Sequence, residues 1–186
     1  MLAEAHASFV HLHATAKPKF AGQYEMMDLA ASLRQAALGK GDAAEQFDHV
    51  LWSVSEASKA DRAHALGKIR LHAKVAPLGA GHDVLGGAWR ERWLKPDSVL
   101  YVLLQHGQDE LSGAPRFVLV EWVGSEVSEE LLGELGLDDL TTEVEKALAK
   151  VLPVALSLQA SEAEQLSPEA IEAAQQDAIA QADAAQ

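Results

Sequence analysis

Two nearly continuous apolar runs stand out in the second half of the chain. They cover residues 99–104 and 117–123, and a polar connection at 107–115 joins them. Strands that are covered on both faces have this composition, whereas half-exposed strands alternate between apolar and polar residues. The pattern predicts two neighbouring central strands of one sheet, with helices packed above and below them.

Shorter patterns predict three further strands. Residues 50–54 form a short run of β-prone residues, and residues 69–75 alternate between apolar and polar positions. Residues 154–158, which follow Pro153, alternate in the same way. Such alternation is typical of a strand with one buried and one exposed face.

Helical spacing appears in four places. Residues 28–37 carry apolar side chains on one stripe, and two tryptophans four residues apart, Trp89 and Trp93, precede Pro96. Ser167 and Pro168 are suited to the N-cap and first position of a final helix.

A long helix precedes Pro153, and we predict it over residues 138–150. Apolar residues recur there at spacings of four, four and three, which places them on one stripe: Leu140, Val144, Leu148 and Val151. The glycines at positions 133 and 136 predict a break or an irregular turn before it.

The predicted element order is α-β-β-α-β-β-α-β-α. It indicates an α/β (α+β) fold with a central mixed five-stranded sheet sandwiched between helices. A chain of 186 residues fits one domain, which we place at residues 25–182. Residues 1–24 lack a clean period and are predicted to form an N-terminal extension.

The negative charge lies in the C-terminal third. The chain has 28 acidic and 15 basic residues, but residues 124–186 hold 14 acidic residues and only Lys146 and Lys150 as basic ones. Nucleic acids and anionic membranes attract lysine and arginine, so neither is an expected partner. We expect a cytoplasmic protein, because no segment has the pattern of a signal peptide or of a membrane span.

The sequence gives no indication of catalysis. There is no cysteine, and the motifs of serine hydrolases and zinc proteases are absent. Paired carboxylates such as Asp138 and Asp139 are typical of the solvated face of a helix. We predict no enzyme activity, no cofactor and no metal site.

The second central run and the segment after it resemble a known family. Residues 98–180, and above all the stretch with Phe117, Trp122, Gly124 and Val127, are similar to the second half of an actin-depolymerising-factor homology (ADF-H) domain. Within that family, the sequence most resembles the coactosin-like and drebrin-like groups. The resemblance implies a central mixed sheet with two helices on each side.

The resemblance also implies actin as the partner, bound without chemistry by a monomeric cytoskeletal module. Such domains set their long helix into the actin cleft or lie along filaments. On helix 138–150 the candidate contacts are Thr142, Glu143, Lys146 and Lys150. A filament-contacting basic residue would fall on Arg116, just before the second central strand.

The chain departs from the family in its charges. Where relatives carry a basic stretch, it has Glu129, Glu130 and Glu134, and the loop before Arg116 holds acidic residues. Exposed charge pairs are worth about 0.2–1 kcal/mol each, so several reversals together change affinity substantially. The alternative is therefore a diverged interaction module that binds a basic partner rather than actin.

Overall fold

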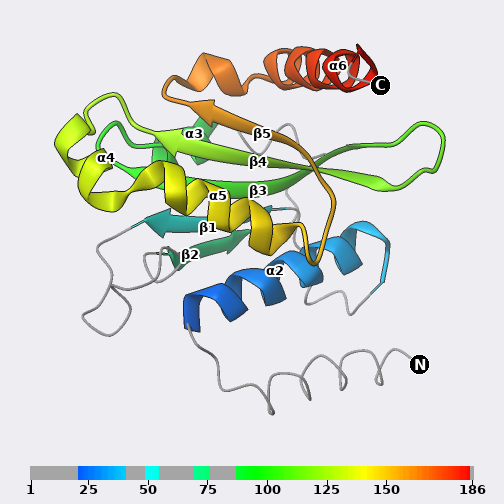
Figure 1. Cartoon of the computed structure of the whole chain (residues 1–186), viewed down its shortest axis with the longest axis horizontal. Helices are drawn as coiled ribbons and strands as arrows, with labels where there is room; N and C mark the ends of the chain where they lie inside the picture. The colour runs from blue at the N-terminus through cyan, green and yellow to red at the C-terminus, as the bar shows by residue number, and fades with distance from the viewer. Residues whose placement is uncertain (1–20, 41–48, 55–68, 76–86, 185–186) are drawn as a thin grey trace.

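The computed structural model describes residues 21–40, 49–54, 69–75 and 87–184. Its elements follow the predicted alternation of helices and strands (Figure 1). They are α2 (Ala21–Ala37), β1 (His49–Val54), β2 (Ile69–Val75), α3 (Gly87–Trp93), β3 (Val99–Gln108), β4 (Pro115–Val123), α4 (Glu129–Leu135), α5 (Leu137–Leu148), β5 (Val154–Ala160), the 3-10 helix η3 (Ala163–Leu166) and α6 (Pro168–Ala184).

The strands form one mixed sheet in the order β2-β1-β3-β4-β5. Neighbours are antiparallel except for β4 and β5, which run parallel. The two long apolar runs therefore lie side by side inside the sheet, with Leu103 opposite Leu119, as predicted. The mixed α+β class is confirmed.

Both faces of the central strands are covered, because alternate residues point to opposite sides. On one face, Tyr101, Leu119 and their neighbours pack against α2 and α5. On the other face, Val102 and Val120 belong to a second cluster that includes residues from the end of α3 and from α6. Figure 1 shows α6 on one side of the sheet and α2 and α5 on the other.

The end of β4 is fixed against the segment that follows α3. The indole Nε1 of Trp122 donates to the carbonyl of Lys95 at 2.9 Å, and the amide of Gly124 donates to the carbonyl of Ser98 at 3.0 Å. A side chain at Gly124 would overlap the backbone of Pro96. Two of the residues that carry the family resemblance therefore have structural roles.

Two boundaries differ from the sequence prediction. Helix α2 begins at Ala21 rather than Asp28, and the fully buried Met26 extends its apolar stripe backwards. Strand β3 continues to Gln108, past the apolar run, as the arm of a hairpin whose exposed end has no apolar pattern. Residues 1–20 lie outside the described part of the chain, so the predicted extension stays a prediction.

Candidate binding surface

The α4–α5 pair follows directly from the local sequence. Ser128 caps α4 by accepting the amide of Leu131 at 3.2 Å. Gly136, with φ 59° and ψ 53°, ends α4 and starts α5 in the left-handed conformation that glycine adopts most readily. Of the two glycines that predicted a break before α5, Gly136 is where the break occurs, while Gly133 lies within α4.

Helix α5 is strongly two-sided. Its inner stripe is buried in the core and comprises Leu137, Leu140, Val144, Ala147 and Leu148. This confirms the predicted stripe at three of its four positions, while the fourth, Val151, lies beyond the helix and packs against the same core. The opposite side of α5 is left for solvent or a partner.

The outer side carries three of the predicted contact residues. Lys146 pairs with Glu143 at 2.8 Å across one helical turn, and their side chains are 63% and 46% exposed. The hydrogen bond from Lys146 and its positive charge lower the pKa of Glu143. Thr142 is exposed, and its hydroxyl donates to the carbonyl of Asp138 at 3.0 Å.

Lys150 lies beyond α5, which corrects the predicted helix of residues 138–150. The helix ends at Leu148, and tighter turns follow before Pro153. The guanidinium of Arg34 on α2 donates to the carbonyl of Val151 at 3.0 Å and holds this turn in place. Lys150 is exposed, but because it lies outside the helix it does not share a helical face with Lys146.

Arg116 lies at the start of β4, on the β3–β4 hairpin, and pairs with Asp109 at 3.3 Å. Asp109 also accepts the amide and hydroxyl of Ser112, each at 2.8 Å. These hydrogen bonds and the arginine lower the pKa of Asp109 to about 2. Asp109 is thus the residue that orders the hairpin turn, and Leu111 within that turn is 99% exposed.

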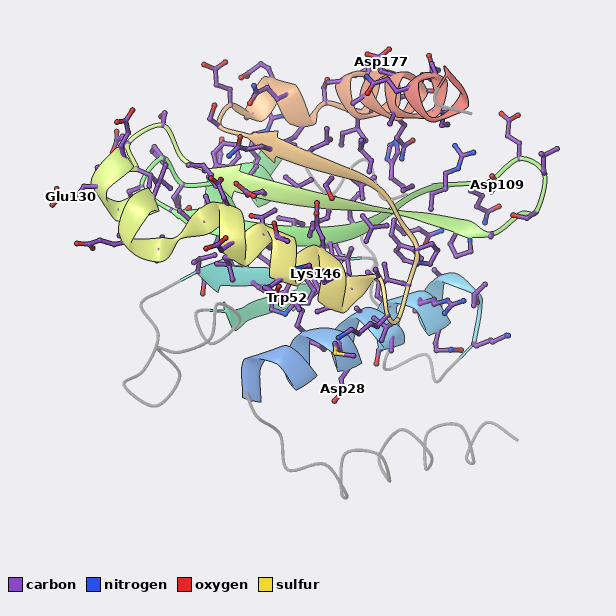
Figure 2. All side chains as sticks on the ribbon, viewed as in Figure 1. Asp28, Trp52, Asp109, Glu130, Lys146 and Asp177 are labelled. Atoms are coloured by element: carbon purple, nitrogen blue, oxygen red, sulfur yellow. The ribbon has the colours of Figure 1, made fainter. Side chains whose placement is uncertain are left out.

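The structure does not bring the predicted contacts into one patch. Figure 2 labels Asp109, the partner of Arg116, on the projecting hairpin and Lys146 on α5, where it lies in the last turn. A partner that touches both would have to span the distance between them. The two groups are therefore separate surfaces, and alternation along β4 puts Arg116 on the side of Val118 and Val120, opposite α5.

A polar network around the buried Tyr101 and Glu121 links α5 to the sheet. Tyr101 on β3 and Thr141 on α5 have their hydroxyl oxygens 2.5 Å apart. Thr141 donates in turn to the carboxylate of Glu121 on β4, and the amide of Gln159 on β5 donates to the same carboxylate at 2.9 Å. Sequence reasoning missed this network, because its four residues come from four different elements.

Neither a metal site nor a membrane-spanning helix is found in the part of the chain that the structure describes. Among the described residues, no group of three or more histidine, cysteine, aspartate or glutamate side chains could hold a metal ion. Within the same residues, no helix combines the length and apolar character that crossing a bilayer requires.

The arrangement of sheet and helices is that of ADF-H domains, and the resemblance inferred from sequence is confirmed at the level of the fold. Coactosin from Entamoeba histolytica superposes with a TM-score of 0.54 and 19% identity, over 80% of this chain and 91% of that one. The human coactosin-like protein gives 0.53 and 16%, over 81% of this chain and 95% of that one.

Mouse coactosin, described as an actin filament binding protein, gives a TM-score of 0.52 and 17% identity, over 78% of this chain and 84% of that one. The sequence matches no protein-family model and no curated protein. The likeness is therefore one of fold.

Proposed function

We propose that this chain is a coactosin-like actin-binding module that acts in the cytoplasm on the cytoskeleton, by binding rather than by catalysis. The observation that carries the proposal is the outer side of α5, where Thr142, Glu143 and Lys146 are presented on a helix whose other side is buried. A fold shared with an actin filament binding protein supports it.

The two basic residues of the C-terminal third decide this proposal. Charge reversal of both, Lys146→Glu with Lys150→Glu, removes attraction to an acidic actin surface and adds repulsion. At about 0.2–1 kcal/mol per exposed pair, we expect affinity to fall about tenfold. Co-sedimentation with filaments and binding to labelled monomers measure the change.

A matched control is available on the opposite face of the sheet. The double variant Arg92→Glu with Lys95→Glu changes net charge by the same amount at exposed positions near α3. If α5 is the contact, this variant binds nearly as well as the natural chain. Equal loss in both double variants would show only an effect of net charge, and unchanged binding after charge reversal of Lys146 and Lys150 would reject this surface.

Arg116 supplies a second test on the hairpin. We expect Arg116→Ala to weaken filament binding about two- to fivefold and to leave monomer binding unchanged, because one exposed charge contact is lost. Arg92→Ala is the control, since it removes an exposed arginine from α3, an element separate from the β3–β4 hairpin. Equal filament binding by the two variants would remove Arg116 from the contact.

A further inference from the structure

A hollow of about 300 Å³ lies between α5 and the β5 edge of the sheet. Its polar lining comes from three elements that are distant in the sequence. From β4, α5 and β5 it includes Glu121, Asp138, Thr141, Thr142, Ser157 and Gln159.

The hollow exists because α5 leaves one side of the edge strand β5 uncovered. Gln159 pairs with Glu121 in the parallel register, and its side chain reaches that carboxylate on the α5 side of the sheet. Ser157, two residues earlier, points the same way, and both side chains are exposed. The alternate residues Leu156 and Leu158 pack on the other side.

Glu121 is the feature of the hollow that most needs an explanation. It is 8% exposed, lies within the apolar run 117–123 and, among the described residues, accepts hydrogen bonds from the uncharged groups of Thr141 and Gln159. No basic side chain in the described residues pairs with it. Burying a carboxylate without an opposite charge is costly. A cationic group from a partner would offset this cost at Glu121.

The surroundings of Glu121 are also negative. Burial raises the pKa of Tyr101 well above its ordinary value, and the charges of Glu121, Glu145 and Asp138 raise it further, against the effect of its hydrogen bond to Thr141. Lys146, the basic residue of α5, is already paired with Glu143 on the outer side. The hollow therefore offers acceptor oxygens and a negative potential.

We propose that this hollow binds an arginine side chain presented by a protein partner, with Glu121 at the floor and Asp138 as the second carboxylate. A guanidinium carries several donors in one plane, and carboxylates and hydroxyls are the acceptors it matches. A divalent cation fits less well, because the described residues bring no three metal-ligating side chains together. The site shares Thr142 with the proposed actin contacts but includes none of Glu143, Lys146 or Arg116, and it does not depend on actin being the partner.

The test uses the full chain and a labelled short oligo-arginine peptide. Fluorescence anisotropy measures the affinity of the natural chain and of Glu121→Gln, which keeps the shape of the side chain and can still accept hydrogen bonds. We expect Glu121→Gln to weaken binding about tenfold, because it removes a largely desolvated charge pair. Urea denaturation of each variant verifies that it remains folded.

Asp139→Asn is the matched control. It removes the same charge from an exposed residue that neighbours Asp138 but does not line the hollow. We expect its affinity to change no more than about twofold. Equal weakening in Glu121→Gln and Asp139→Asn would overturn the proposal, because the peptide would then be held by net charge alone.

Amide shifts in NMR spectra locate the peptide on the surface. The proposal expects shifts at residues 138–142 and 157–159, and shifts confined to other segments would contradict it. Displacement of the peptide by magnesium chloride, but not by the same ionic strength of sodium chloride, would also overturn it in favour of a metal site. The variant Lys146→Glu with Lys150→Glu keeps peptide binding, so the failure of one proposal does not imply the failure of the other.

Discussion

Gly124 occupies a position where the backbone after α3 crosses the end of β4. A Cβ atom there would overlap the carbonyl of Pro96, so Gly124→Ala forces two backbone segments apart. We expect it to lower the free energy of unfolding by about 1–3 kcal/mol. Urea denaturation followed by circular dichroism measures the loss.

Gly133 provides the comparison. It lies within α4, and a Cβ atom there would meet nothing within 4 Å. Because alanine favours the helix over glycine, Gly133→Ala should raise stability by up to about 1 kcal/mol. Similar losses in both variants would show that contact with Pro96 is not the cause.

Asp109 gives a pH prediction. Its folded-state pKa of about 2 is below the ordinary value, so its contribution to stability is complete above about pH 4 and is lost as the pH falls towards 2. Ser112→Ala removes a hydrogen bond to the carboxylate and should raise that pKa towards its usual range. Carbon-detected NMR titration of the Asp109 carboxyl tests this, and an unchanged pKa in the variant would refute the assigned cause.

At the scale of elements, helix α5 is joined to the sheet by hydrogen bonds as well as by packing. Thr141→Val keeps the side-chain shape but leaves the hydroxyl of Tyr101 and one oxygen of Glu121 without that partner. Each unsatisfied buried group costs about 1–3 kcal/mol, so we expect a loss of that size in the free energy of unfolding.

Thr142→Val is the matched control for Thr141→Val, because it makes the same change at a neighbouring position of α5. The hydroxyl of Thr142 is exposed and bonds only within its own helix, so its loss should cost less than about 1 kcal/mol. Chemical denaturation of both variants measures the difference. If Thr141→Val and Thr142→Val lower the free energy of unfolding equally, the polar network around Glu121 does not hold α5 in place.

The sequence predicts the interior of the elements better than their ends. The apolar runs of β3 and β4 and the stripe of α5 are found as predicted, because burial imposes a repeating pattern on the chain. The end of α5 and the far end of β3 were misplaced. Both depend on contacts made by exposed or distant groups, such as Arg34 with Val151, which leave no period.

At the scale of the whole molecule, the uneven charge should influence stability. Residues 124–186 carry 14 acidic and two basic side chains, and they form α4 and α5 on one face and α6 on the other. Their mutual repulsion is screened by salt. We expect the urea midpoint to rise between low and moderate sodium chloride, and a midpoint that falls would show that attractive pairs dominate instead.

The sequence predicts candidate contacts that lie on one helix, but it does not predict sites formed by residues from several elements. Single residues on one helix, such as Lys146, follow from periodicity. Glu121, Thr141 and Gln159 meet only after the chain has folded, since they belong to β4, α5 and β5. A charge inside an apolar run, Glu121 between Val120 and Trp122, was the one signal in the sequence that could have drawn attention to the site.

The parallel pairing of β4 with β5 has a consequence for how the chain is made. Residues 124–153, including both α4 and α5, separate the two strands along the chain, so closing this connection carries an entropic cost. Until then β4 presents an open, almost wholly apolar edge, the kind of surface on which chains aggregate. We therefore expect a chain truncated before β5 to aggregate more readily than the full chain.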